Sequence, residues 1–253
     1  MTEPFKLKRI PTLKTAEAFR SHVDTLGIEI PCDDQIVTEG SPIGEALAGL
    51  TINGKTIGNR IALHPMEGWD GTEDGNPSEL TLRRWRRFGL SGAQLIWGGE
   101  AVAVDASGRA NPSQLVIADH TLAGLEGLRA ALLDSHRDRF GSAPEPIIGL
   151  QLTHSGRFAR PHKDAAPQPR IAYRHPLLDE RVGVSDDGAA LSDPEVEALI
   201  ESFVNAAVRA AALGFEFVDI KHCHGYLLHE FLGAHTRQGP YGGSFENRTR
   251  LLR

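Results

Sequence analysis

Four short segments of the chain carry polar or glycine-rich residues directly after an apolar run. They are residues 64–67, 98–101, 151–154 and 221–224. Their side chains include imidazoles, carboxylates, an amide, an ammonium group and a thiol, which are the groups that bind, donate and accept protons in active sites. We expect the four segments to form one site, although each taken singly also fits a simple turn.

The cluster Lys-His-Cys-His at 221–224 could suggest a metal site. Alternation along a strand, however, sends Lys221 and Cys223 to one face and His222 to the other, so no shared ion is expected. Cys223 is interpreted as a small buried apolar residue, because the sequence identifies no base that would activate its thiol. His229 and Glu230, on the turn that follows, fit surface and packing roles equally.

Two further segments bear on anion binding. Residues 154–157 place a donor and a fixed cation on a glycine-permissive turn, which suits either an anion or the anchoring of a loop. No phosphate-cradling glycine fingerprint follows the first predicted strand, and this argues against a Rossmann dinucleotide domain.

The elements that must position these segments alternate along the chain. Apolar runs at 61–64, 93–97, 147–152 and 217–221 predict strands. Helical spacing predicts helices at 79–88 and 119–140, another from 245 onward, and the clearest one after Ser192. Four strands separated by helices indicate βαβ units and a parallel sheet, as a barrel or as an open sheet. In both, the carboxyl ends of the strands meet at one edge, where active-site and ligand-binding residues are usually found.

Local signals define the helix that begins after Ser192. Glu195 completes a capping box with Ser192, and Pro194 lies in the first turn, where its missing N–H does no harm. One apolar stripe is predicted to face the core, formed by Val196, Leu199, Ile200, Phe203, Val204, Ala207, Val208 and Ala211.

The amino-terminal part differs from the rest. Residues 1–45 are interpreted as a surface extension with a short helix at 14–26, since prolines interrupt the remainder. Asn53-Gly54, between two short apolar runs, predicts a hairpin with a type I′ turn.

Composition limits the classes of function. The 253 residues are 40% hydrophobic and 24% charged, with a formal net charge of -6, so we expect a folded protein that binds neither nucleic acid nor a membrane. Two cysteines make no disulfide framework, and the charged first 20 residues make no secretory signal, so a cytoplasmic location is expected.

In their order along the chain, the motifs resemble the old yellow enzyme family of flavin-dependent ene-reductases and 2,4-dienoyl-CoA reductase-like enzymes. The resemblance covers residues 42–253 and rests on Asn59-Arg60-Ile61, Pro65-Met66, Glu100-Ala101, Gly108-Arg109, Gln151-Leu152, His154-Ser155-Gly156-Arg157, His224-Gly225-Tyr226-Leu227, His229-Glu230-Phe231-Leu232, Tyr241-Gly242-Gly243-Ser244 and Glu246-Asn247-Arg248.

The resemblance implies an α/β TIM barrel, (β/α)8, of the FMN-linked oxidoreductase type. Only about the first four β/α units are expected in residues 46–253, after the extension at 1–45. The alternative function is therefore a catalytically incomplete half-barrel. Such a chain would need a complementary chain, or a homo-oligomer, to supply the rest. Any 4Fe-4S cluster of larger relatives would lie outside these units, so the sequence does not bear on it.

The resemblance also implies the chemistry. FMN would receive hydride from NADH or NADPH and pass it to an activated alkene of the enone or enoyl type, a small-molecule substrate. The implied cofactor-binding residues are His64, Pro65, Met66, Glu67, Ala101 and Gln151. His224 and Lys221 occupy the positions of the pair that holds the substrate carbonyl, Tyr226 that of the proton donor, and Trp69 that of a substrate-facing aromatic.

Two residues depart from the family pattern. Lys221 stands where the family usually has histidine, and Glu67 where it usually has threonine or cysteine. We expect the two to face each other and partly neutralise their charges, because an unpaired buried charge is costly. A separation above about 6 Å would contradict this. The departures also leave open oxidation of an amine, or demethylation.

Overall fold

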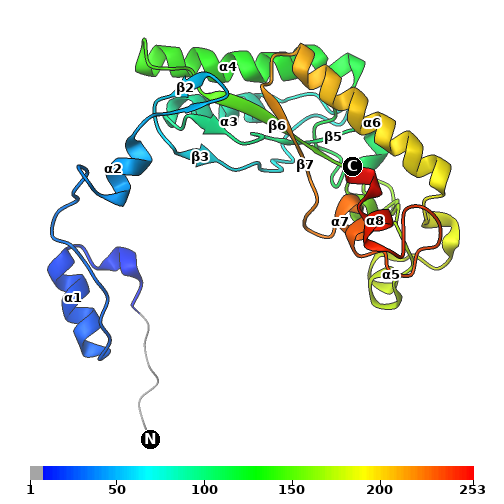
Figure 1. Cartoon of the computed structure of the whole chain (residues 1–253), viewed down its shortest axis with the longest axis horizontal. Helices are drawn as coiled ribbons and strands as arrows, with labels where there is room; N and C mark the ends of the chain where they lie inside the picture. The colour runs from blue at the N-terminus through cyan, green and yellow to red at the C-terminus, as the bar shows by residue number, and fades with distance from the viewer. Residues whose placement is uncertain (1–7) are drawn as a thin grey trace, which may run out of the picture. The chain divides into compact units, whose positions relative to one another are not determined.

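The computed structural model describes residues 8–253, which form two compact units, one ending at Leu47 and one spanning Ala48–Arg253 (Figure 1). The first unit contains the 3-10 turn η1 (Ile10–Thr12) and the helices α1 (Ala16–Thr25) and α2 (Pro42–Leu47). Helix α1 confirms the short helix predicted at 14–26. Its amino end is capped by the Thr15 side chain, which accepts a hydrogen bond from the Ala18 amide.

The second unit opens with the predicted hairpin. Strands β1 (Leu50–Ile52) and β2 (Lys55–Ile57) pair antiparallel. The turn residues Asn53 and Gly54 have φ values of 48° and 80°, the left-handed conformation that a type I′ turn requires.

A parallel sheet follows, built from β3 (Ala62–Leu63), β4 (Leu95–Ile96), β5 (Ala101–Ala103), β6 (Ile147–Thr153) and β7 (Phe217–Ile220). All four predicted strands are present. The second continues past its predicted end as β5, after an interruption at Gly98 and Gly99, whose φ values are 81° and 43°.

The pairing order matches that of a barrel. The backbone groups of the odd-numbered residues of β6 form hydrogen bonds with β4 and β5. The backbone groups of its even-numbered residues form hydrogen bonds with β7. β4 and β5 are therefore two segments of one strand along one edge of β6, with β7 on the other edge. Each successive strand lies beside the preceding one, without the reversal of a doubly wound sheet.

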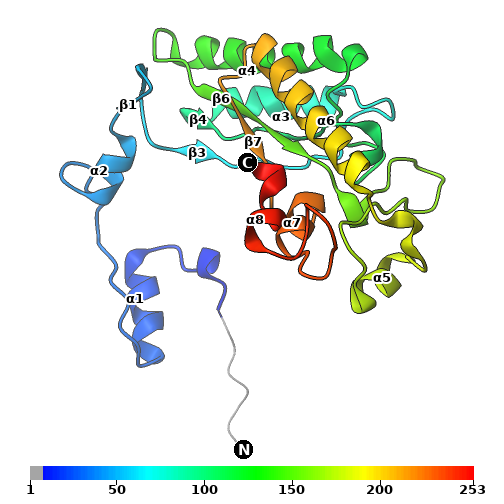
Figure 2. The ribbon, with the colours of Figure 1, turned by 45° about the vertical axis from the view of Figure 1, so that its right-hand side comes forward.

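Three long helices cover one face of this sheet (Figures 1 and 2). They are α3 (Glu79–Leu90), α4 (Leu122–Phe140) and α6 (Asp193–Ala212), and α3 packs along α4. All seven residues of β6 are buried, so this strand lies at the centre of the core. The capping box of Ser192 and Glu195 is present at the start of α6, as predicted.

Part of the predicted stripe on α6 is wrong. Val196, Leu199 and Phe203 are buried, but Val204 and Val208 are 50% and 64% exposed. The buried face continues instead through Ala206 and Ala210. The residues 199, 203, 206 and 210 repeat at intervals of four and three, whereas 204 and 208 lie about 100° around the helix toward solvent.

Short helices follow the carboxyl ends of the strands. They are α5 (Pro176–Val182), α7 (Leu227–Leu232) and α8 (Phe245–Arg248), the last being the helix expected from 245 and continuing as the 3-10 turn η6 (Arg250–Leu252). The Leu227 amide donates to the His154 carbonyl just after β6 and ties α7 to that strand end. Within residues 8–253, no helix combines the length and apolar composition that a membrane span requires.

Candidate active site

A cavity of about 600 Å³ lies at the carboxyl ends of the parallel strands. It is lined by His64, Pro65, Met66, Glu67, Trp69, Trp97, Gln151, Asp219, Lys221, Cys223, His224 and Tyr226. The structure thus brings together every residue predicted for the site except Ala101. Ala101 is 1% exposed and pairs with Gln151 in the sheet, and its carbonyl accepts a hydrogen bond from Gln114 Nε2 at 2.9 Å.

Three lining residues were absent from the predicted site. Asp219 lies two residues before Lys221 and so on the same face of the strand, a signal that the sequence did contain. Trp97 directly precedes the glycine interruption, and its ring lies 5.1 Å from that of Phe217. Cys223 was expected to be buried and this is wrong: β7 ends at Ile220, so Cys223 lies in the following loop and is exposed.

Glu67 is the centre of the polar contacts in this cavity. Its Oε1 forms an ion pair with Lys221 Nζ. Its Oε2 accepts hydrogen bonds from the Tyr226 hydroxyl at 2.7 Å and from Trp69 Nε1 at 3.2 Å. The expected pairing of Glu67 with Lys221 is confirmed, and one carboxylate receives donors from three side chains.

Lys221 and Tyr226 also contact each other. The Lys221 side chain is 3% exposed, and its Nζ lies 4.3 Å from the centroid of the Tyr226 ring, within the range of a cation–π contact. Burial, together with the hydrogen bond to Glu67 and the charge of that residue, raises the pKa of the Tyr226 phenol. Tyr226 therefore keeps its proton at neutral pH and donates a hydrogen bond to Glu67.

The loop that carries Glu67 and Trp69 is held from beneath by an ionic cluster. Glu100 accepts a hydrogen bond from the Gly68 amide at 3.0 Å. Arg84, on α3, contacts Glu100 at 2.5 Å and Asp70 at 2.8 Å. A Cβ on Gly68 would lie 2.1 Å from Arg84 Nη2, so any larger residue at this position would displace the Arg84 guanidinium.

Burial changes the pKa of Glu100, the carboxylate at the centre of this cluster. The Glu100 side chain is 2% exposed. Burial raises its pKa to about 7, although the charge and hydrogen bond of Arg84 act in the opposite direction.

Trp69, on the same loop, has a φ of 48°, an uncommon left-handed conformation for an aromatic residue. The cluster therefore positions a strained loop, and sequence reasoning gave it no role.

The structure decides between the two interpretations of residues 154–157. Arg157 is fully buried and forms ion pairs with Asp179 and Glu230, and its Nη2 donates to the Tyr173 carbonyl at 2.9 Å. Its guanidinium is occupied by protein groups, so this segment anchors loops. Glu230 accordingly has a packing role, and burial raises its pKa.

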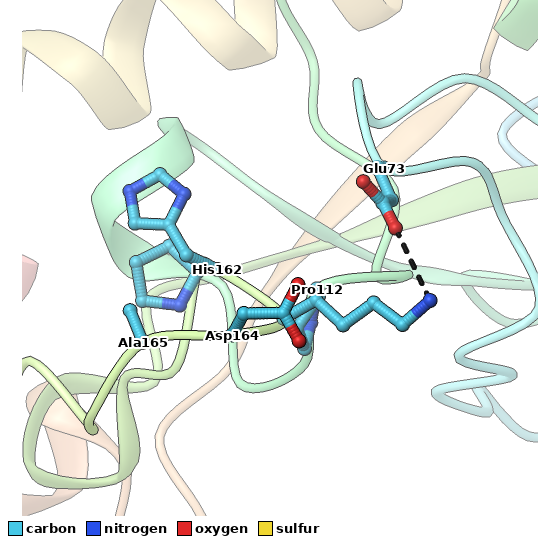
Figure 3. A pocket seen from close by; sticks show the side chains of 7 residues that line it. Glu73, Pro112, His162, Asp164 and Ala165 are labelled. Atoms are coloured by element: carbon cyan, nitrogen blue, oxygen red, sulfur yellow. Dashed lines mark ion pairs between the residues drawn. The ribbon is translucent and has the colours of Figure 1, made fainter.

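A second cavity, of about 350 Å³, is lined by loop residues that include Glu73, Pro112, His162 and Asp164 (Figure 3). Lys163 spans 3.6 Å to Glu73, and both side chains are about 70% exposed. No residue from a strand end lines it. The strand-end cavity is therefore the stronger candidate site.

Comparison with known proteins agrees with this geometry. Residues 47–253 match the model of the NADH:flavin oxidoreductase / NADH oxidase family. The chain belongs to this family. Among its relatives, NADPH dehydrogenase of Geobacillus sp. (strain WCH70) is 34% identical over 80% of this chain and 55% of the relative. NADPH dehydrogenase of Bacillus subtilis (strain 168) is 34% identical over 81% of this chain and 56% of the relative.

Solved structures support the fold of this family member. Old Yellow Enzyme from Pichia sp. AKU4542 superposes with a TM-score of 0.65 at 21% identity, over 82% of this chain and 54% of that one. TcOYE with pHBA gives a TM-score of 0.65 at 26% identity, over 83% of this chain and 60% of that one. The expected resemblance and the α/β fold of a partial barrel are confirmed. The chain spans about half the length of the curated relatives it matches.

Proposed function

We propose that the protein is an FMN-dependent oxidoreductase that takes hydride from NADH or NADPH and reduces an activated alkene. The observation that carries this proposal is the convergence of Gln151, Lys221, His224 and Tyr226 on one cavity at the carboxyl ends of the strands. The family description and the NADPH dehydrogenase relatives support the redox class.

The lining of the cavity fits a flat aromatic cofactor. Pro65, Met66 and Trp97 supply apolar surface, and polar side chains converge on the cavity beside it, a combination found in small-molecule sites. Gln151 Nε2 donates to Asp219 at 2.6 Å, which leaves its amide oxygen without a partner among the residues that the structure describes. That oxygen can accept a hydrogen bond from the N–H of a flavin pyrimidine ring.

The approach of two strands beside Gln151 depends on Gly98. A Cβ on Gly98 would lie 3.0 Å from the Gln151 amide nitrogen and 3.2 Å from Pro65 Cβ. Gly98 therefore allows the first three strands to close together under the cavity. His64, Pro65, Met66, Glu67 and Gln151 are the residues that we propose hold FMN, which when bound supplies the hydride chemistry.

Residues on the opposite wall suit the substrate. Lys221 and His224 would donate hydrogen bonds to the carbonyl oxygen of a neutral enone, Lys221 through an ammonium N–H that the pairing with Glu67 leaves free, and these bonds would stabilise the charge that develops on that oxygen. Tyr226 would give a proton to the α-carbon, and Trp69, which is 47% exposed, would contact the substrate face. Because Glu67 pairs with Lys221, the ammonium charge is compensated within the site.

A second candidate function is the oxidation of an amine. The charged residues of the cavity are the carboxylates of Glu67 and Asp219 and the ammonium of Lys221, so the lining carries one net negative charge. This charge favours a cationic amine over an anionic ligand.

Anaerobic reduction and reoxidation tests both candidates. We expect NADPH or NADH to bleach the visible absorbance of the bound flavin, and 2-cyclohexenone to restore it. Restoration by air alone, with no effect of the enone, would contradict alkene reduction. Bleaching by a secondary amine without any nicotinamide would support the second candidate. A chain that binds no flavin would contradict both.

A further inference from the structure

The three donors around Glu67 form the arrangement that proteins use to bind an oxyanion. An ammonium, a phenol and an indole N–H come from Lys221, Tyr226 and Trp69, and all three end on the same carboxylate. Glu67 and Lys221 are 11% and 3% exposed, so water competes little for the ion pair between them. Charge-assisted bonds of this kind are the strong ones.

We propose that Glu67 is a resident anion: its carboxylate permanently compensates the charge of Lys221, so that the cavity binds neutral and cationic ligands in preference to anionic ones. The proposal deepens the function inferred above and shares with it only the assumption that ligands enter this cavity. It assigns to Glu67 the choice of ligand charge.

Two features of the surroundings support this assignment. Asp219 adds a second carboxylate to the lining. It accepts a hydrogen bond from the neutral amide of Gln151, which does not compensate its charge. Lys221 is the only ammonium or guanidinium group among the residues that line the cavity, and Glu67 already pairs with it. An incoming carboxylate or phenolate would therefore meet two carboxylates and no ammonium or guanidinium group that is free of a carboxylate partner.

The position of Glu67 makes displacement by a ligand unfavourable. Its loop is fixed by the hydrogen bond that the Gly68 amide donates to Glu100 and by the ion pair of Arg84 with Asp70. Moving the carboxylate would break its bonds to the three donors or disturb this support. Glu67 therefore acts as a permanent part of the site.

Three probes of similar shape and different charge test the proposal: benzoate, benzamide and benzamidine. Their dissociation constants are measured by calorimetry on the full chain. For the wild type we expect benzamide and benzamidine to bind more tightly than benzoate. For Glu67→Gln we expect benzoate to gain at least tenfold in affinity relative to benzamide, and benzamidine to lose affinity, because Lys221 is then free to pair with the ligand.

Two further variants keep the test decisive. Glu67→Thr removes the charge with a smaller side chain, and serves if the glutamine variant does not fold by circular dichroism. Lys221→Met should change the preference the other way, with benzoate weaker and benzamidine tighter than in the wild type. Glu73→Gln, a highly exposed carboxylate outside this cavity, is the matched control and should leave all three constants unchanged.

An unchanged ratio of benzoate to benzamide in both Glu67 variants would overturn the proposal, and so would equal gains for all three probes. Failure of every probe to bind the wild type and the variants would also overturn it. Flavin absorbance recorded on the same samples reports the proposed cofactor separately, so loss of flavin with retained charge selection would count against the redox function alone.

Discussion

Glu100 gives a prediction in which pH changes the stability of the fold. Its side chain is 2% exposed and its pKa is raised to about 7, from 4.5 for a free glutamate. Between these values the folded chain binds more protons than the unfolded chain. The stabilising contribution is therefore complete below the unfolded pKa and is lost as pH rises through the folded one.

The size of the effect follows from the shift. A difference of about 2.5 pKa units corresponds to about 3 kcal/mol. Glu100→Gln is the perturbation. Glutamine resembles the protonated acid, and its side-chain oxygen can still accept the hydrogen bond from the Gly68 amide. Relative to this variant, the wild type should lose about 3 kcal/mol of unfolding free energy between about pH 4.5 and about pH 8.

Urea unfolding of both proteins across this pH range provides the assay. Glu79→Gln, at a carboxylate that is 85% exposed, is the control and should show no such slope relative to the wild type. Parallel curves for the wild type and Glu100→Gln would refute the reasoning, because they would mean that Glu100 has the same pKa in the folded and unfolded chains.

Three further substitutions test the elements around the site. Arg157→Met leaves the buried Glu230 without its cation and removes one of the two cations that pair with Asp179, so it should destabilise the fold by about 3–5 kcal/mol, measured by urea unfolding; a loss below about 1 kcal/mol would contradict burial of the ion pairs. Ser192→Ala removes the hydroxyl that donates to Glu195 at 2.7 Å at the start of α6 and should cost about 1 kcal/mol in the same assay, against no loss for Ser202→Ala, a half-buried serine inside the same helix. Gly149→Ala would place a Cβ 2.3 Å from the Phe217 ring, so we expect a loss of about 1–3 kcal/mol, and an unchanged midpoint would show that the two strands are farther apart.

Local signals in the sequence were sufficient for the elements. The Asn53-Gly54 turn and the box of Ser192 and Glu195 predict the hairpin and the start of α6, because each depends on residues adjacent in the chain. The strand ends were also predictable, and so was the pairing of Glu67 with Lys221, since two opposite charges at one edge of a sheet are costly apart.

Long-range contacts were not predictable in this way. Arg84 lies on a helix 16 residues before Glu100, and nothing in its local pattern indicates that it supports the Glu67 loop. The choice between anion binding and anchoring for Arg157 depends on Asp179 and Glu230, 22 and 73 residues away. The burial of Ala101, away from the cavity, results from the way β5 packs on β6 after the glycine interruption.

The central claim, that the strand-end cavity binds flavin, is tested most directly by the dissociation constant of FMN. It can be measured by quenching of flavin fluorescence with the wild type, with Gln151→Leu, and with Gln168→Leu, an exposed glutamine outside the cavity, as the control. We predict saturable binding of one FMN per chain, weakened about threefold to tenfold in Gln151→Leu through loss of one hydrogen bond, and unchanged in Gln168→Leu. Absence of binding to the wild type, or equal affinity in all three proteins, would contradict the claim.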